Sequence, residues 1–306
     1  MVTTCPVCYG GDSRECTTLT DHWSGEAFRL HRCESCRTYY LKDPPDEAAL
    51  ARYYDNPLGA AMWEGSSKSF SILQRLAFAR DFSPLFKVLP QHATIVDYGA
   101  GAGEAARYIH SRGYQVHALD MYDSSQWKSS QIDYRQVNLN GDRVTQDNLL
   151  WNGKAPDAVF LRHVLEHLAN PRRVLELFAR LEIPYVLIVV PNVNSWLQGP
   201  FGHAWYYWDP PRHLTFFSRQ TLSQLCDAAG YEVIKFRHYG IDEVVTSLFR
   251  WILLREQHTG RTLSPNEFHS RLSLRLLQPK GILAGLSSGM SCWLNTVCWC
   301  LARRRN

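Results

Sequence analysis

The chain has 306 residues, enough for one α/β domain of about 200 residues with a smaller module beside it. Its contents of 45% hydrophobic and 20% charged residues exclude intrinsic disorder as the default state. The net charge is only +4, much of it in the terminal Arg303, Arg304 and Arg305, which argues against a nucleic-acid partner and favours a small-molecule or glycan partner.

The N-terminal part contains two Cys-x-x-Cys pairs, Cys5-Pro6-Val7-Cys8 and Cys33-Glu34-Ser35-Cys36, separated by 24 residues. This spacing predicts a four-thiolate zinc ribbon over residues 1–45, with a strand at Phe28–Arg32. Four thiolates complete a tetrahedral shell, so the expected Zn²⁺ is structural. Two redox pairs or two disulfides are the alternatives.

The start of the chain, Met1 to Gly11, has no apolar segment of the kind that a secretory signal needs. We therefore expect a cytoplasmic protein with reduced thiols. Residues 41–46 form a proline-containing linker, after which residues 46–306 form the second domain. Residues 47–55 and 66–89 are expected to be helices.

A glycine-rich turn follows the apolar segment Thr94-Ile95-Val96. Asp97 ends this predicted strand, and glycines occupy every second position from Gly99 to Gly103, before a predicted helix at residues 104–112. Such a turn admits a ligand close to the backbone, and the helix directs its free N–H groups at the same place. The alternative is a tight turn that binds no ligand.

The next predicted strand, residues 115–120, ends in Asp120, roughly 20 residues beyond the glycines, where doubly wound folds bind a ribose. The pattern Asp97-x-Gly-x-Gly-x-Gly resembles the first motif of class I methyltransferases that use S-adenosylmethionine (SAM). A pyrophosphate-binding turn has a different glycine spacing. An acidic residue ahead of the glycines also suits a cationic sulfonium ligand.

A third strand is expected at residues 133–140. The resemblance implies that Asn138 reads the adenine amino group, although Asn138 and Asn140 equally suit the turn before Gly141. The cofactor-binding residues that the resemblance implies are Asp97, Gly99, Ala100, Gly101, Gly103, Asp120, Met121, Asn138, Arg162 and His163.

The apolar segment at residues 156–161 predicts a buried strand, followed by His163-Val164-Leu165-Glu166-His167-Leu168 and a helix that starts at Pro171. This order is similar to the fourth motif of the group that includes the ubiquinone-biosynthesis O-methyltransferases and many sugar and small-molecule methyltransferases. Arg162 and His163 then face the cofactor. For Glu166 and His167, local hydrogen bonding is at least as good an interpretation as catalysis.

Another central strand is expected at residues 185–192. The aromatic segment that follows, residues 196–208, predicts a loop that folds over the substrate. In the segment Pro211-Arg212-His213-Leu214, His213 is a candidate general base, with bracing of the loop by Arg212 and His213 as the alternative. Ser218 is expected to cap a helix at residues 219–229.

The C-terminal part predicts a strand at residues 230–237, a helical insertion at 241–290 with helices at 241–256 and 264–277, and a final antiparallel strand at 296–302. The fold implied is α/β, a Rossmann-like seven-stranded methyltransferase sheet. Residues 281–302 carry no charge, which leaves a spanning helix or peripheral membrane contact as alternatives.

The sequence therefore indicates a SAM-dependent methyltransferase that acts on oxygen or nitrogen of a small-molecule, sugar or lipid-linked acceptor. His163, His213 or solvent would remove the acceptor proton. An NAD-dependent oxidoreductase and a catalytically inactive interaction protein are the alternatives. The sequence indicates no oligomeric state.

Overall fold

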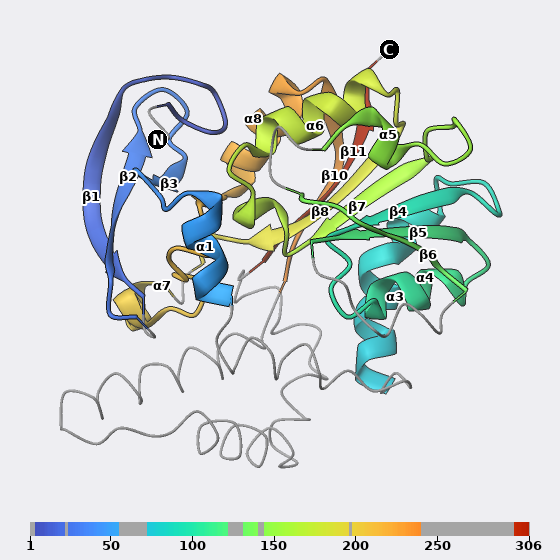
Figure 1. Ribbon diagram of the computed structural model, residues 1–306, viewed down its shortest axis with the longest axis horizontal. Coiled ribbons are helices and arrows are strands. Elements are labelled where there is room, and N and C mark those ends of the chain that lie inside the picture. Colours follow the sequence, from blue (N-terminus) through green and yellow to red (C-terminus); the bar gives the residue numbers. More distant parts are fainter. Residues whose placement is uncertain are drawn as a thin grey trace.

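The computed structural model describes residues 4–21, 24–54, 72–121, 131–139, 144–195, 198–239 and 297–305. Two sheets organise this part of the chain (Figure 1). A four-stranded sheet contains the N-terminal strands, and a seven-stranded sheet carries helices on both faces.

The seven-stranded sheet has the order β10-β11-β8-β7-β4-β5-β6. Its neighbours are parallel from β8 to β6, and β11 lies antiparallel between β8 and β10. This arrangement confirms the predicted seven-stranded α/β fold with a final antiparallel strand. The strands are β4 (Thr94–Tyr98), β5 (Gln115–Asp120), β6 (Asp133–Gln136), β7 (Ala158–Arg162), β8 (Tyr185–Pro191), β10 (Tyr231–Tyr239) and β11 (Val297–Arg304).

Helices α3 (Ile72–Phe86) and α4 (Glu104–His110) cover one face of this sheet, and α6 (Pro171–Arg180) and α8 (Arg219–Ala228) cover the other (Figure 1). Alternate strand residues point to opposite faces. In β4, Ile95 therefore joins the apolar cluster of α3 and α4, whereas Val96 joins the cluster of α6 and α8. Burial on both faces explains the continuous apolar sequence of the central strands.

The helix ends follow local sequence signals. The Ser218 hydroxyl accepts a hydrogen bond from the Thr221 backbone N–H at 3.2 Å, which confirms the predicted cap of α8. Asn170 caps α6 and Pro171 occupies the first turn, where its missing N–H costs nothing. The short helix α5 (Gln146–Leu149) begins with a capping box at Thr145.

The four-stranded sheet has the order β1-β2-β3-β9 and is antiparallel throughout. Its strands are β1 (Ser13–Thr20), β2 (Ala27–Cys33), β3 (Tyr39–Leu41) and β9 (Thr215–Phe216). Strand β9 comes from the second half of the chain, so the N-terminal module shares a sheet with the segment that contains His213. Helix α1 (Glu47–Tyr54) follows β3.

Several sequence expectations differ from the structure. Strand β6 ends at Gln136, four residues before the expected end. The aromatic segment contains helix α7 (Gln198–Phe201) and a 3-10 helix η4 (Gly202–Ala204) instead of a continuous loop. Its Trp205, Tyr207 and Trp208 are buried at 5% exposure or less, because their rings pack on one another and on the core rather than lining an open loop.

The structure describes only part of the C-terminal region for which the sequence predicts helices and strands. The predicted helices at 241–256 and 264–277, the insertion at 241–290 and the segment 66–71 lie outside the described residues. Residues 297–302 belong to β11, which rules out a spanning helix that runs through Ala302. Within the described ranges, no helix has the length and apolar character needed to cross a membrane.

Candidate functional site

The glycine-rich turn joins β4 to α4 at the carboxyl edge of the parallel strands. Gly99, Gly101 and Gly103 have φ of 83°, 53° and 73°, the left-handed region that favours glycine. The N–H groups of Gly99 and Ala100 donate to the carbonyl of Leu119 at 2.9 and 3.0 Å, which holds the turn against the end of β5. A Cβ at position 99 would lie 2.3 Å from Cγ2 of Val164, so this turn has no room for a side chain there.

Two carboxylates meet at this turn. Asp120, the last residue of β5, accepts a hydrogen bond from the Gly101 N–H at 2.7 Å. Asp97 is only 2% exposed, and its Oδ2 has no hydrogen-bond partner among the described residues. Burial first, and then the charge of Asp120, raise the pKa of Asp97 well above its usual value. A buried carboxylate beside a second one favours a cationic ligand.

The remaining cofactor candidates lie at the same sheet edge. Met121 follows β5, Asn138 lies two residues beyond β6, and Arg162 is the last residue of β7. The Arg162 guanidinium Nε is 3.8 Å from Oδ2 of Asp81, a buried aspartate of α3. The topology thus brings the predicted cofactor residues together, as expected for the carboxyl ends of parallel strands. Asp81 carried no signal in the sequence.

The residues after β7 form a histidine and glutamate cluster. His163 has a φ of 55°, and its Nδ1 lies 3.5 Å from Oε1 of Glu166 in the 3-10 helix η3 (Leu165–His167). Glu166 is 1% exposed. Burial by itself would raise the pKa of Glu166, but the neighbouring His163, His167 and His213 outweigh burial and lower it. The carboxylate is therefore ionised inside the protein.

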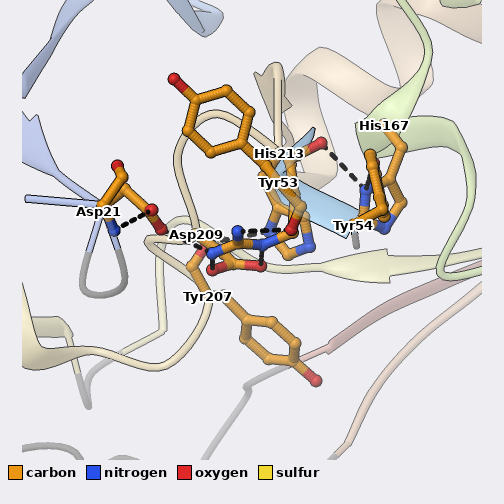
Figure 2. A network of polar contacts seen from close by, with 9 residues as sticks. Asp21, Tyr53, Tyr54, His167, Tyr207, Asp209 and His213 are labelled. Atoms are coloured by element: carbon orange, nitrogen blue, oxygen red, sulfur yellow. Dashed lines mark hydrogen bonds and ion pairs between the residues drawn. The ribbon is translucent and has the colours of Figure 1, made fainter. Parts of the chain in front are cut away.

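His213 lies against this cluster from the segment before β9. Its ring is 4.6 Å from that of His167, and its Nδ1 is 2.9 Å from the carbonyl oxygen of Tyr207. The side chain is buried, which, together with the charge of His167, lowers the pKa of His213 to about 4. Figure 2 shows His213, His167 and Tyr54, whose hydroxyl is 3.2 Å from Nδ1 of His167.

Arg212 braces the same segment. Its Nη2 binds Asp21 at 2.8 Å and Asp209 at 2.5 Å, and its Nη1 donates to the carbonyl of Tyr53 at 3.2 Å. Asp21, Tyr53 and Asp209 come from the end of β1, from α1 and from the loop after η4, and converge in Figure 2. Arg212 therefore connects the N-terminal module to the histidine segment, which agrees with the bracing alternative. Asp21 and Tyr53 gave no signal in the sequence.

The four predicted zinc ligands form a second cluster. The Sγ atoms of Cys5 and Cys36 are 3.4 Å apart and those of Cys8 and Cys33 are 3.5 Å apart, and the four sulfurs lie within 4.8 Å of one another. Zn–S bonds of about 2.3 Å in a tetrahedron place sulfurs roughly 3.8 Å apart. The separations exceed a disulfide bond, and these four cysteines are free thiols. This donor set fits Zn²⁺.

The fold and the glycine-turn site define a class I SAM-dependent methyltransferase. A family model described as a methyltransferase domain matches residues 71–235, which is more than half of the chain, and the chain belongs to that family. This membership argues against the NAD-dependent oxidoreductase. No curated protein sequence matches the chain.

Two solved structures illustrate the similarity. Phosphoethanolamine N-methyltransferase 2 from Haemonchus contortus, in complex with SAM, has a TM-score of 0.50 and 16% identity, with 88% of this chain and 62% of that chain covered. The 1,6-didemethyltoxoflavin-N1-methyltransferase from Burkholderia thailandensis has a TM-score of 0.49 and 15% identity, with 94% of this chain and 100% of that chain covered. At such identities the likeness concerns the fold alone.

Proposed function

We propose that this protein transfers a methyl group from SAM to an oxygen or nitrogen atom of a small-molecule or glycan acceptor. The observation that supports this most is the buried Asp97 carboxylate, which lacks a hydrogen-bond partner on Oδ2 and lies beside the glycine turn and Asp120. Membership of the methyltransferase family supports the type of reaction, and the geometry of the site supports the choice of the residues that take part.

In this proposal the cofactor contributes an electrophilic methyl group. The turn at Gly99, Ala100, Gly101 and Gly103 lets it approach the backbone, and Asp120 accepts hydrogen bonds from its ribose. Asp97 attracts its positive charge. Asn138 and Met121 contact the adenine side, while Arg162 and His163 close the site from β7.

His163 is the residue that we place at the acceptor. It follows β7 directly, its side chain is 30% exposed, and its ring lies parallel to that of Tyr207 at 6.1 Å. It can orient the acceptor and take its proton, while Glu166 fixes the other side of the imidazole. His213 is the second candidate, but its burial and its Nδ1 contact with Tyr207 favour a supporting position behind His163.

We further propose that residues 1–45 form a zinc module, with Cys5, Cys8, Cys33 and Cys36 as its four ligands, and that residues 46–306 form the methyltransferase domain. With four thiolate ligands the metal has no open coordination position, so its role is structural. A cytoplasmic location and peripheral membrane contact by the C-terminal segment stay predictions.

Calorimetry with SAM tests the proposed cofactor site. Replacing Asp120→Ala should weaken binding by about 1.5–3 kcal/mol, because the ribose loses charge-assisted hydrogen bonds. Asp147→Ala, at an exposed position of α5, is the matched control and should bind as the wild type does. Equal affinity of the Asp120 and Asp147 variants would remove the proposed ribose role.

Turnover is measured in parallel as formation of S-adenosylhomocysteine with a panel of small-molecule amines, phenols and sugars. His163→Ala should lower kcat by roughly 10²-fold or more if this residue contacts the acceptor. No turnover with any acceptor, together with normal SAM binding, would favour an inactive interaction protein.

A further inference from the structure

Within the histidine and glutamate cluster, Glu166, His167 and His213 form a set of potential metal ligands beside His163. Glu166 and His167 lie in η3, and His213 comes from a segment 46 residues further along the chain. One donor atom from each of the three lies within 4.8 Å of the other two. Glu166 and His213 are buried, at 1% and 7% exposure.

Hydrogen bonds to backbone carbonyls fix the proton positions on both imidazoles. Nδ1 of His167 is 2.9 Å from the Arg212 carbonyl oxygen, and Nδ1 of His213 is 2.9 Å from that of Tyr207. A carbonyl oxygen only accepts, so Nδ1 carries the hydrogen in each ring and Nε2 presents a lone pair. Metal-binding histidines usually donate their other ring N–H in this way.

The surroundings of the Glu166 carboxylate also favour a metal ion. Neither Oε1 nor Oε2 has a hydrogen-bond partner among the described residues, and the nearest charged group is Nδ1 of His163, 3.5 Å from Oε1. Buried carboxylates are normally paired, hydrogen-bonded or bound to a metal. His163 reaches one oxygen at ion-pair distance, which leaves the second oxygen for another cation.

We propose that Glu166, His167 and His213 bind one divalent transition-metal ion through the carboxylate and the two Nε2 atoms. Imidazole ligands select ions such as Zn²⁺, Co²⁺ or Fe²⁺ over Mg²⁺ and Ca²⁺, which prefer oxygen. Three protein ligands leave the ion an open coordination position, in contrast to the closed four-cysteine site. This site does not depend on which acceptor the enzyme methylates.

Co²⁺ absorption spectroscopy on the full chain distinguishes the two metal sites. Thiolate ligands give Co²⁺ intense sulfur-to-metal charge transfer in the near ultraviolet, whereas nitrogen and oxygen ligands give only weaker visible bands. Wild-type protein, with zinc retained by the cysteines after brief EDTA treatment, should bind one equivalent of Co²⁺ with visible bands and no new thiolate absorption. His213→Gln and Glu166→Gln should weaken this binding by about 10-fold or more.

His110→Gln, at an exposed histidine of α4, is the matched control and should bind Co²⁺ as the wild type does. Circular dichroism and SAM calorimetry verify that each variant is folded. If the variants at the buried residues do not fold, the Co²⁺ absorption spectrum of the wild-type protein still tests the proposal. The proposal is overturned if wild-type protein takes up no Co²⁺ outside the cysteines, or if folded His213→Gln and Glu166→Gln variants bind it with unchanged affinity.

Discussion

Burial of the Asp97 carboxyl group lowers the stability of the ligand-free protein. The same burial creates a site that favours a positively charged ligand. Its pKa is raised by burial and by Asp120, so the native state binds a proton more tightly than the unfolded chain does. The resulting stability is present below the unfolded pKa of about 3.9 and is lost as pH rises through the raised native pKa. At neutral pH, Asp97 therefore destabilises the ligand-free protein.

We expect Asp97→Asn to stabilise the ligand-free protein by roughly 1–3 kcal/mol near neutral pH, because the amide has the same shape without the buried charge. The gain should shrink as pH falls through the raised pKa. The same change should weaken SAM binding, since the positive sulfonium loses its partner. Thermal unfolding and calorimetry across the pH range measure both effects, and a variant with unchanged SAM affinity would contradict the cofactor role of Asp97.

At the scale of the elements, two factors favour glycine at position 99 in the β4–α4 turn. One is the backbone conformation, and the other is the nearby side chain of Val164. Gly99 has a positive φ, as Gly113 does at 90°, but only Gly99 faces a side chain, that of Val164 after β7. Nothing lies within 4 Å of a Cβ built at Gly113. The two positions therefore separate backbone strain from crowding.

Gly113→Ala should cost about 1–2 kcal/mol in unfolding free energy, from the left-handed conformation alone. Gly99→Ala should cost more and should also lower SAM affinity, because the turn must move away from Val164. Adding Val164→Ala to Gly99→Ala should restore part of both losses. Denaturant unfolding and calorimetry on the three variants measure these effects. If Gly99→Ala and Gly113→Ala had the same effect on stability and on SAM binding, crowding at Val164 would be excluded.

At the scale of the whole molecule, the N-terminal module contacts the rest of the protein at the start of α6 and at the segment that contains His213. At α6, the Tyr9 hydroxyl donates to Oδ1 of Asn170 at 3.2 Å. Strand β9 pairs with β3, and the buried Arg212 binds Asp21 and Asp209. His213 lies between these two connections. The glycine turn belongs to the other sheet. Unfolding of the N-terminal module should therefore disturb the acceptor side before it disturbs the cofactor side.

If Cys5, Cys8, Cys33 and Cys36 bind zinc as proposed, Cys33→Ser should release the metal and unfold the module, since one missing thiolate opens the tetrahedral shell. SAM affinity should stay close to that of the wild type, whereas turnover should fall at least about 10-fold as the His213 segment loses its support. Cys16→Ser, at an exposed cysteine of β1, is the control. Metal analysis, calorimetry and turnover are measured together. Full turnover with an unfolded module would show that the two parts act separately.

The sequence by itself determined the elements whose signals are local. The glycine pattern after Asp97 located the end of β4 and the start of α4, Ser218 marked the start of α8, and the apolar segments gave the parallel strands. These features depend on backbone conformation, capping and burial over a few residues. The spacing of the four cysteines likewise predicted the cluster that they form.

Only the tertiary structure brought together residues that are far apart in the chain. The clustering of Glu166 with His213, the ion pair of Arg212 with Asp21 and the pairing of β9 with β3 each bring together segments separated by dozens of residues or more. No local signal records them, because such contacts follow from how the two sheets pack. The location of the aromatic side chains was also decided by the tertiary structure, through burial. The aromatic residues Trp205, Tyr207 and Trp208 look the same in sequence whether they line a loop or fill a core, and the packing of the fold places them in the core.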